Sequence, residues 1–350
     1  MPNENVQIDI RSLSLDQLKD QLVAFGEKAF RAKQVYEWLW QKSAIDFEEM
    51  TNLSIALRAH LKEHYKILPI KLDMMQKSND GTIKSRFELH DGHMIESVLI
   101  PVPKDDRFTV CVSSQVGCSL TCSFCATGKM ARIRNLDPAE IYDQVQMVNQ
   151  QCIEHFGKRL SNIVFMGMGE PLLAYRNVLG GIAKITDENG LGFSSKRITV
   201  STAGIAKMIK KLADDEVRFN LALSLHAADD EKRSTIMPIN DQNDLKSLME
   251  ALQYFYHNTR NKISYEYILL EGFNDSEEDA HHLAKLCKTF PVRVNIINYN
   301  PIDMGMFDRS SEDTTDRFAR ILRSHDVMVT VRKSRGEDID AACGQLANKN

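Results

Sequence analysis

The chain has 350 residues, more than one small domain needs, and 43% of them are hydrophobic, enough to build a substantial core. With 26% charged residues, 17 Gly and 9 Pro, its composition excludes collagen-like, low-complexity and wholly disordered proteins. The formal net charge of −4 provides no overall basic field that would attract nucleic acid, although it is compatible with a local basic groove.

The chain contains seven cysteines, and three of them, Cys118, Cys122 and Cys125, lie close together. An odd number with one tight cluster does not resemble a disulfide framework and indicates a metal or redox site in a reducing compartment. The first ten residues lack the basic and apolar regions of a secretory signal, and no run approaches the roughly eighteen apolar residues of a membrane-spanning helix. We therefore expect a cytoplasmic protein with no membrane attachment.

Residues 1–72 have the pattern of a small helical domain. From about residue 14 to residue 66 apolar side chains recur at helical spacing, as in Leu18, Leu22 and Phe25. Several basic residues are available for one face of this domain, namely Arg31, Lys33, Lys42 and Arg58. They are either ordinary solvated charges around a helical core or part of an accessory module that grips a polyanion such as RNA.

Residues 73–104 have the pattern of a β extension or linker that leads into the main domain. Lys84–Leu89 and Met94–Ile100 are short β-rich stretches, and His-Asp-Gly at 90–92 predicts a hairpin turn between them. The main domain then occupies residues 105–350.

In the main domain, apolar runs rich in β-branched residues alternate with amphipathic helical stretches. The runs expected to form strands are Thr109–Ser113, Asn162–Met166, Arg197–Thr202, Val217–Leu225, Ile263–Leu269, Val292–Tyr299 and Val327–Val331. The helical stretches between them include Pro138–His155, Ile205–Ala213, Leu245–Asn258 and Ser276–Lys288. This alternation predicts an α/β fold with a parallel sheet, and the number of units favours a partial TIM-like (β/α)6 barrel. In such a barrel the active site lies at the carboxyl ends of the strands.

The sequence Cys118-Ser-Leu-Thr-Cys122-Ser-Phe-Cys125 follows the first strand of the predicted barrel. Three thiolates at this CxxxCxxC spacing can hold three irons of a [4Fe-4S] cluster and leave the fourth iron open. An open iron can bind S-adenosylmethionine and pass it the electron that splits it. Structural zinc, which usually takes a fourth protein ligand, and merely buried thiols are the alternatives.

Several longer segments resemble one family of enzymes. They are CVSSQVGCSLTCSFCATG, FMGMGEPLL, ITVSTAGI, LSLHA, MPIN and RGEDIDAACGQL. The cysteine spacing is similar to that of the radical S-adenosylmethionine (radical SAM) superfamily. Within it, the segments resemble the RlmN/Cfr RNA adenine methyltransferases, and RlmN more than Cfr. The resemblance runs from about residue 15 to the end of the chain and implies a radical SAM barrel with a [4Fe-4S] cluster on Cys118, Cys122 and Cys125.

Polar residues and glycines close several strands of the predicted barrel. By themselves they have ordinary explanations, since tight turns, helix N-caps and satisfied core polar groups are common at such positions. The resemblance implies instead that they form the pocket for S-adenosylmethionine, with Gly169 and Glu170 at its amino group. The other pocket residues that it implies are Ser201, Ser224, Leu225, His226 and Asn300.

Three residues receive catalytic roles through the resemblance. Cys343, in a carboxyl-terminal loop, is the cysteine that becomes S-methylated. Cys111 resolves the covalent RNA intermediate by forming a transient disulfide with Cys343, and Glu96 matches the family's proton acceptor. Without the resemblance, Cys111 has the pattern of a small buried residue, and Glu96 that of a surface carboxylate on the β extension. Cys152 and Cys287 lie on apolar helical faces and are expected in the core.

The resemblance also implies a reaction and its partners. Two molecules of S-adenosylmethionine per turnover would serve to methylate C2 of adenosine in 23S rRNA, at the peptidyl-transferase centre, and in tRNA, next to the anticodon. The family implies an electron donor such as flavodoxin, and we expect a monomer. Methylation at adenine C8, as in Cfr, and a non-catalytic iron–sulfur or zinc protein that binds RNA are the alternatives.

Three groups of basic residues are candidates for contact with RNA. They are Lys129, Arg132 and Arg134 after the cysteine cluster, Lys196 and Arg197 at the start of the third strand, and Arg332, Lys333 and Arg335 before the Cys343 loop. We expect the three groups to gather around the mouth of the barrel as a local basic rim.

Overall fold

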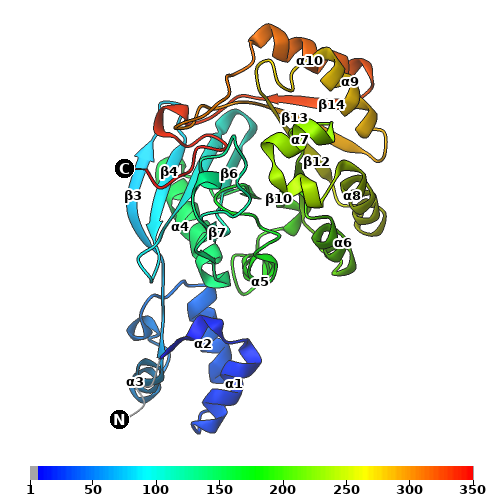
Figure 1. Cartoon of the computed structure of the whole chain (residues 1–350). Helices are drawn as coiled ribbons and strands as arrows, with labels where there is room; N and C mark the ends of the chain where they lie inside the picture. Colours follow the sequence, from blue (N-terminus) through cyan, green and yellow to red (C-terminus); the bar gives the residue numbers. More distant parts are fainter. Residues whose placement is uncertain (1–6, 350) are drawn as a thin grey trace.

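The computed structural model describes residues 7–349, and a ten-stranded sheet forms the centre of the molecule (Figure 1). Seven neighbouring strands of this sheet are parallel and follow one another in chain order. They are β6 (Arg107–Cys111), β9 (Asn162–Phe165), β10 (Ile198–Thr202), β11 (Asn220–Ser224), β12 (Ile263–Leu269), β13 (Val292–Asn298) and β14 (Met328–Arg332). Each parallel pair needs a crossover connection, and every crossover here contains a helix.

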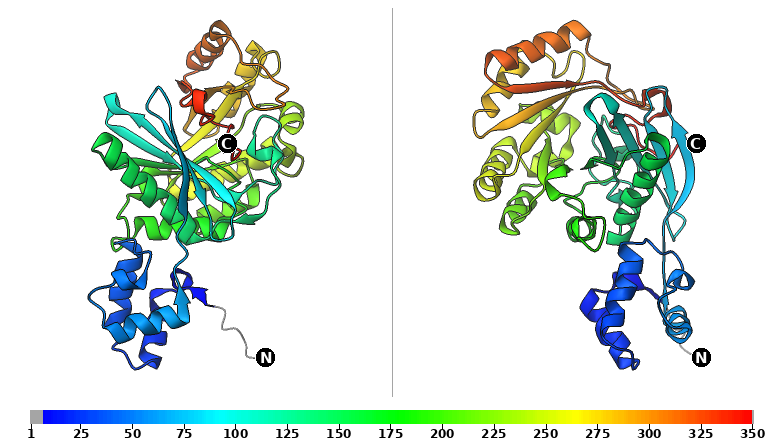
Figure 2. Two further views of the ribbon diagram at one scale, coloured as in Figure 1. Left: turned by 90° about the vertical axis from the view of Figure 1, so that its left-hand side faces the viewer. Right: turned by 180° about the vertical axis from the view of Figure 1, so that it is seen from behind.

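The crossovers contain seven helices, and all of them except α7 lie outside the curved sheet (Figure 2). They are α4 (Pro138–Phe156), α5 (Tyr175–Thr186), α6 (Ala206–Asp214), α7 (Asp230–Ile236), α8 (Leu245–Thr259), α9 (Glu277–Leu286) and α10 (Glu312–Ser324). Because α7 and α8 share one crossover, six βα units precede β14. The sheet does not close on itself and ends in two edge strands, β14 and β3 (Lys71–Lys77). The predicted partial (β/α)6 barrel is therefore confirmed.

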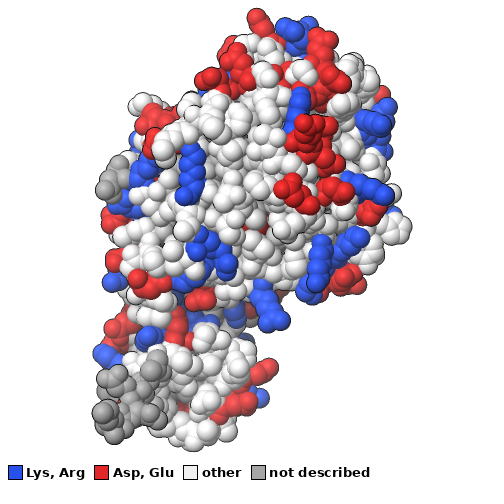
Figure 3. Space-filling view, viewed as in Figure 1, with Lys and Arg blue, Asp and Glu red and all other residues white. Residues whose placement is uncertain are grey.

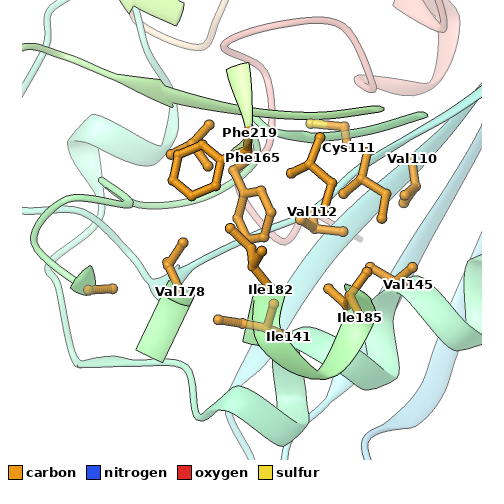
Figure 4. Packing of buried hydrophobic residues seen from close by; sticks show 14 of the residues in the cluster. Val110, Cys111, Val112, Ile141, Val145, Phe165, Val178, Ile182, Ile185 and Phe219 are labelled. Carbon is orange, nitrogen blue, oxygen red and sulfur yellow. The ribbon is translucent and has the colours of Figure 1, made fainter. Parts of the chain in front are cut away.

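Helix α4 illustrates how the local sequence sets these elements. The Glu140 carboxylate accepts a hydrogen bond from the Asp137 N–H (2.8 Å), Pro138 occupies the first turn, and Gly157 ends the helix with φ +65°. Figure 4 shows Ile141 and other buried side chains of α4 and α5 packed beneath the strands. Burial of each large apolar side chain stabilises this layer by about 1.5–3 kcal/mol.

Three antiparallel strands extend the same sheet beyond β6. They are β3, β4 (Ile83–Glu88) and β5 (Met94–Val102). β4 and β5 pair on either side of residues 90–92, which confirms the predicted hairpin. β5 then pairs with β6, so the extension is continuous with the barrel sheet. On β3 the register shifts between Leu72 and Met74, which places a bulge in this edge strand.

The amino-terminal part of the chain forms a helical lobe beneath α4 and α5 (Figures 1 and 2). It contains α1 (Leu15–Ala24), α2 (Phe30–Trp40) and α3 (Ile55–His64), and the short strands β1 (Ile8–Asp9) and β2 (Tyr65–Lys66) pair beside them. Arg11 joins the lobe to the barrel, since its Nη1 lies 2.8 and 2.9 Å from the two carboxylate oxygens of Asp143 on α4. The Lys184 ammonium of α5 lies over the rings of Tyr36 and Trp40.

After β14, the last residues return across the open side of the barrel towards β3 and β4 (Figure 1). The Asp338 carboxylate there accepts hydrogen bonds from the Ser78 hydroxyl (2.5 Å) and the Asn79 N–H (3.1 Å). Among residues 7–349, no helix is long and apolar enough to cross a membrane.

Candidate active site

A cavity of about 160 Å³ opens at the carboxyl ends of the parallel strands. Nine of the residues proposed from the sequence line it, namely Cys118, Cys122, Cys125, Gly169, Glu170, Ser201, Ser224, His226 and Cys343. They come from widely separated segments, which the barrel brings together because all its parallel strands end at the same face.

The three clustered cysteines lie in a loop whose ends are joined by the antiparallel pair β7 (Gln115–Val116) and β8 (Arg134–Asn135). Within the loop, the Cys125 N–H donates to the Cys122 carbonyl (3.2 Å), which forms a tight turn. Gly128 packs against this turn so closely that a Cβ would lie 2.8 Å from the Cys122 carbonyl oxygen. The loop therefore holds the three thiols in one place.

The thiols suit a bound cluster better than a closed zinc site. Four ligands at about 2.3 Å from a tetrahedral zinc would lie only about 3.8 Å from one another. Among residues 7–349, only His90, Asp137 and Glu140 form a trio of metal-binding side chains whose ligand atoms all lie within 4.8 Å of one another. The three clustered thiols do not meet this limit, so their sulfur atoms are spread more widely than zinc ligands would be. Thiolates on different corners of a four-iron cube are likewise farther apart than zinc ligands.

Burial makes these thiols poor acids until a cation replaces their protons. Desolvation raises the pKa of Cys118 to about 11, and it also raises the pKa of Cys122 and of Cys125. For Cys122 the neighbouring Cys125 and Cys118 raise the pKa further. Iron binding deprotonates coordinating thiols, so loading of this site would release protons.

Gly169 and Glu170 form the wall after β9. Gly169 has φ +95°, and a Cβ there would lie 2.5 Å from the Gln115 side chain, so this position requires glycine. The buried Glu170 carboxylate accepts hydrogen bonds from the N–H groups of Leu172 (2.9 Å) and Ala203 (2.8 Å). Burial raises the pKa of Glu170, and these two backbone bonds oppose the rise. The carboxylate thus ties the loop after β9 to the loop after β10.

His226 faces the cavity as a neutral hydrogen-bond donor. Its Nδ1 lies 3.1 Å from the backbone nitrogen of Ile268, whose N–H it accepts, and burial lowers its pKa to about 3. A neutral imidazole that accepts at Nδ1 carries its proton on Nε2. Beside it, the Ser201 and Ser224 hydroxyls lie 3.3 Å apart. These three side chains offer polar groups to a ligand.

Leu225 and Asn300, also proposed as pocket residues, are buried and are not among the residues that line the cavity. Leu225 is fully buried in the hydrophobic core. The Asn300 side-chain amide donates to the Cys343 carbonyl (3.2 Å) and accepts from Arg309 (3.0 Å). Asn300 therefore supports the Cys343 loop.

The Cys343 loop is hydrogen-bonded to the loop that contains the three clustered cysteines. The Ala126 N–H donates to the Gly344 carbonyl (2.7 Å), and the Thr127 hydroxyl donates to the Leu346 carbonyl (2.6 Å). Cys343 lies at the solvent-exposed rim of the cavity, yet desolvation by the surrounding groups raises the pKa of its thiol. The proposed methyl carrier is thus held next to the proposed cluster ligands.

Cys111 lies on β6 with its sulfur on the opposite side from Val110 and Val112, whose side chains point to the helices (Figure 4). Burial raises the pKa of Cys111, and the nearby Cys343 raises it further. All seven cysteines are free, so the disulfide implied by the resemblance is not formed in this structure. Of the two expected core cysteines, Cys152 is fully buried and Cys287 is half-buried at the end of α9.

Glu96 is fully buried on β5, so its interpretation as a surface carboxylate is wrong. Its Oε2 accepts hydrogen bonds from the N–H groups of Ala347 (2.9 Å) and Asn348 (3.1 Å). Its Oε1 lies 3.3 Å from the ammonium of Lys84. Glu96 does not line the cavity and instead binds the chain just after the Cys343 loop.

Two buried residues with ionisable side chains, Arg233 and Glu266, lie at the site although no sequence motif indicated them. Arg233 on α7 donates to the carbonyls of Ala203, Ser224 and Leu225, and burial lowers its pKa to about 10, so it remains charged at neutral pH. It thereby joins the loops after β10 and β11. Glu266 on β12 lines the cavity, and its one sequence signal was a carboxylate within the apolar run ISYEYIL.

The basic residues do not form the single rim expected at the barrel mouth. Lys196 and Arg197 directly precede β10, which places them at the amino end of that strand, opposite the cavity. Arg134 is paired with Asp91 (2.6 Å) and Glu140 (2.8 Å). Figure 3 shows the basic side chains of one face in several separate groups. The expectation failed because a residue before a parallel strand lies at the other end of the barrel from one that follows it.

Two family models match the chain. Residues 8–67 match the ribosomal RNA large subunit methyltransferase N-terminal domain (RlmN_N), and residues 112–284 match the radical SAM superfamily. The first match covers the helical lobe, and the second begins just after β6 and includes the cysteine cluster.

Curated relatives are similar over nearly the whole chain. The probable dual-specificity RNA methyltransferase RlmN of Cytophaga hutchinsonii is 56% identical, with 97% of this chain and 93% of the relative covered. The protein of the same name from Flavobacterium johnsoniae is 55% identical, with 97% of each covered. A crystal structure of a radical SAM methyltransferase from Sphaerobacter thermophilus is 40% identical with a TM-score of 0.92, covering 98% of this chain and all of that one. This enzyme therefore belongs to the RlmN family within the radical SAM superfamily.

Proposed function

We propose that the chain methylates C2 of adenosine in 23S rRNA, at the peptidyl-transferase centre, and in tRNA, next to the anticodon. The observation that carries this proposal is the common cavity of Cys118, Cys122, Cys125 and Cys343. It places a three-thiol site for a cluster beside a cysteine that can carry a methyl group. The names of the relatives, dual-specificity RNA methyltransferase RlmN, support RNA as the substrate.

The three clustered cysteines would hold one [4Fe-4S] cluster, whose role is to supply the electron that cleaves S-adenosylmethionine. Each turnover would consume two molecules of S-adenosylmethionine, one as methyl donor and one as radical source. Glu170 and the backbone at Gly169 would receive its amino group. Ser201, Ser224 and His226 would supply further polar contacts from the cavity wall, and Leu225 and Asn300 would complete the pocket through their contacts with Arg233 and the Cys343 loop.

Cys343 would accept the methyl group and then carry the carbon that bonds to the RNA base. Cys111 would release the methylated RNA by attacking the Cys343 sulfur: a transient disulfide forms as the bond between that sulfur and the RNA-bound carbon breaks, and the released carbon takes up a proton to become the methyl group. Glu96 would take the proton from the adenine C2. Because its carboxylate is buried against Ala347 and Asn348, that step requires the segment after Cys343 to move.

Removal of the resolving thiol should trap the covalent intermediate. In Cys111→Ala, Cys343 still bonds to the RNA but no thiol displaces it, so an RNA–protein adduct should accumulate. Cys343→Ala should yield no adduct. Denaturing gels of anaerobic reactions measure both outcomes, and absence of the adduct from both variants would contradict the assigned roles.

The position of methylation is tested by mass spectrometry of nucleosides from 23S rRNA and tRNA, isolated from cells with and without the protein. The proposal requires 2-methyladenosine that depends on the protein. Dependent 8-methyladenosine would show a Cfr-like reaction, and absence of both would support a non-catalytic RNA-binding protein. The physiological reductant that we propose is a flavodoxin-like protein, and the enzyme would act as a cytoplasmic monomer.

A further inference from the structure

Glu266 is a buried carboxylate in the cavity wall to which the proposed reaction assigns no task. It lies on β12, only 3% exposed, and it pairs in register with Ser224 of β11 and Asn295 of β13. Ser201 of β10 contacts Ser224 in turn. A polar row therefore crosses four strands from the proposed S-adenosylmethionine pocket to Asn295.

The two oxygens of the Glu266 carboxylate have different surroundings. Oε1 accepts hydrogen bonds from the Asn295 amide (2.8 Å) and the Ser264 hydroxyl (3.0 Å), and the Arg332 guanidinium lies 3.7 Å away. Oε2 is buried and has no hydrogen-bond partner. Asn295 and Ser264 hold the carboxylate by one oxygen and leave the other free.

A buried carboxylate oxygen without a donor is unfavourable, and a bound group that donates a hydrogen bond to it would remove this cost. Glu266 lines the same cavity as Cys343 and contributes to the electrostatic environment of its thiol. A group that binds next to Cys343 therefore lies against this side chain, and it can contact Oε2, which has almost no accessible surface, once the carboxylate turns towards the cavity. Since a carboxylate only accepts hydrogen bonds, the bound group must present an O–H or N–H donor.

We propose that Glu266 Oε2 is the hydrogen-bond acceptor for an adenosine group bound beside Cys343. The inference rests on the proposed function, which brings two adenosine groups to this cavity, that of S-adenosylmethionine and that of the target nucleotide. Each offers donors that suit a carboxylate, the ribose hydroxyls in the first case and the 6-amino group of adenine in the second. Glu266 thus extends the polar row of Ser201 and Ser224 as a specificity residue for adenosine.

Binding measurements with two altered ligands test this inference. The first is the 2′,3′-dideoxy analogue of S-adenosylmethionine, and the second is a target RNA with purine riboside, which lacks the 6-amino group, in place of the reactive adenosine. Equilibrium dialysis without reductant gives the affinity of the reconstituted enzyme for each ligand and for its unaltered form. Because no turnover is required, the result does not depend on methylation.

Glu266→Gln is the informative variant. The amide oxygen of the glutamine must take the place of Oε1, because Asn295 and Ser264 donate hydrogen bonds to that position. Its amide NH2 then takes the place of Oε2, so a hydrogen-bond donor replaces the acceptor that would face the ligand. Glu271→Gln, at an exposed carboxylate in the loop after β12, is the matched control. Iron content and circular dichroism establish that each variant folds and binds its cluster.

The inference expects one altered ligand to bind the wild-type enzyme at least about tenfold more weakly than its parent, as for loss of a hydrogen bond to a charged group. That difference should disappear in Glu266→Gln and persist in Glu271→Gln. If only the dideoxy analogue binds more weakly, the partner of Glu266 is the ribose of S-adenosylmethionine. If only the purine riboside RNA binds more weakly, the partner is the target base. If wild-type enzyme binds both altered ligands as tightly as their parents, the inference is overturned, even when Glu266→Gln fails to fold. If the binding results agree with the inference but cells containing the protein form no methylated adenosine, the proposed function fails while the inference about Glu266 stands.

Discussion

At the scale of single residues, His226 links the cavity to the pH dependence of stability. Burial lowers the pKa of its imidazole to about 3, compared with about 6.5 in an unfolded chain. Between these two values the unfolded chain binds the proton and the folded chain does not. This residue therefore lowers the stability of the fold as pH falls below about 6.5.

This effect can be measured by comparing wild-type protein with His226→Gln. From pH 7.5 to pH 5.5 the wild-type free energy of unfolding should decrease by roughly 1 kcal/mol more than that of the variant, which has no imidazole to protonate. Urea denaturation at the two pH values provides the comparison. Equal decreases in the two proteins would show that His226 is protonated as readily in the fold as in the unfolded chain.

The site residues divide into those that local sequence reveals and those that it does not. The cysteine cluster is visible because a short loop places its three thiols at the fixed spacing that a cluster would need. Arg233 gives no such signal, since its hydrogen-bond partners are backbone carbonyls at the ends of two other strands. The burial of Glu96 is equally hidden, because it depends on Lys84 and on residues more than 250 positions away.

At the scale of elements, the contact between the cluster loop and the Cys343 loop should couple the two halves of the reaction. Thr127→Val keeps the shape of the side chain but removes the hydroxyl that donates to the buried Leu346 carbonyl. A carbonyl left unpaired there costs about 1–3 kcal/mol, which should shift Cys343 from its place. We expect about a tenfold slower methylation of Cys343, measured by intact mass, with iron content and reductive cleavage of S-adenosylmethionine measured in parallel.

Thr127→Ser is the control, because it retains the hydroxyl and should methylate Cys343 at close to the wild-type rate. If Thr127→Val lost the cluster as well, the residue would serve the fold of the cluster loop itself. Unaltered methylation in Thr127→Val would show that the hydrogen bond does not position Cys343.

Strand positions were largely predictable, and β12 is observed at the expected residues. The helical ranges named from the sequence did not include α5, which contains the pair Gly180 and Gly181. Glycine disfavours helices when considered locally. The structure explains Gly181, since a Cβ there would lie 2.7 Å from the Ile141 side chain of α4. Close helix packing, which no local pattern records, outweighs the local preference.

At the scale of the whole molecule, the attachment of the helical lobe depends on a buried ion pair. Asp143→Asn would leave the guanidinium of Arg11, a residue that is only 7% exposed, with only partial compensation from Asp9. Removing one partner of a buried ion pair lowers the free energy of unfolding by about 3–5 kcal/mol. We expect a lower melting temperature, faster proteolysis near residues 66–71 and a higher KM for RNA, while cleavage of S-adenosylmethionine without RNA stays normal.

The matched control for this change is Glu277→Gln, which removes an exposed carboxylate 3.9 Å from Arg317. Exposed pairs contribute little, so its stability should lie within about 0.5 kcal/mol of wild type. Equal RNA affinity in Asp143→Asn and wild type would indicate that the lobe does not need a fixed position to bind RNA.

The edge strand β3 bears on how separate copies of this enzyme behave at high concentration. Lys71, Asp73 and Lys77 place charges along it, and its bulge between Leu72 and Met74 interrupts the regular row of backbone groups. Charges and bulges on an edge discourage another chain from adding a strand. A sheet that is open at this end can therefore remain in solution without growing from one molecule into the next.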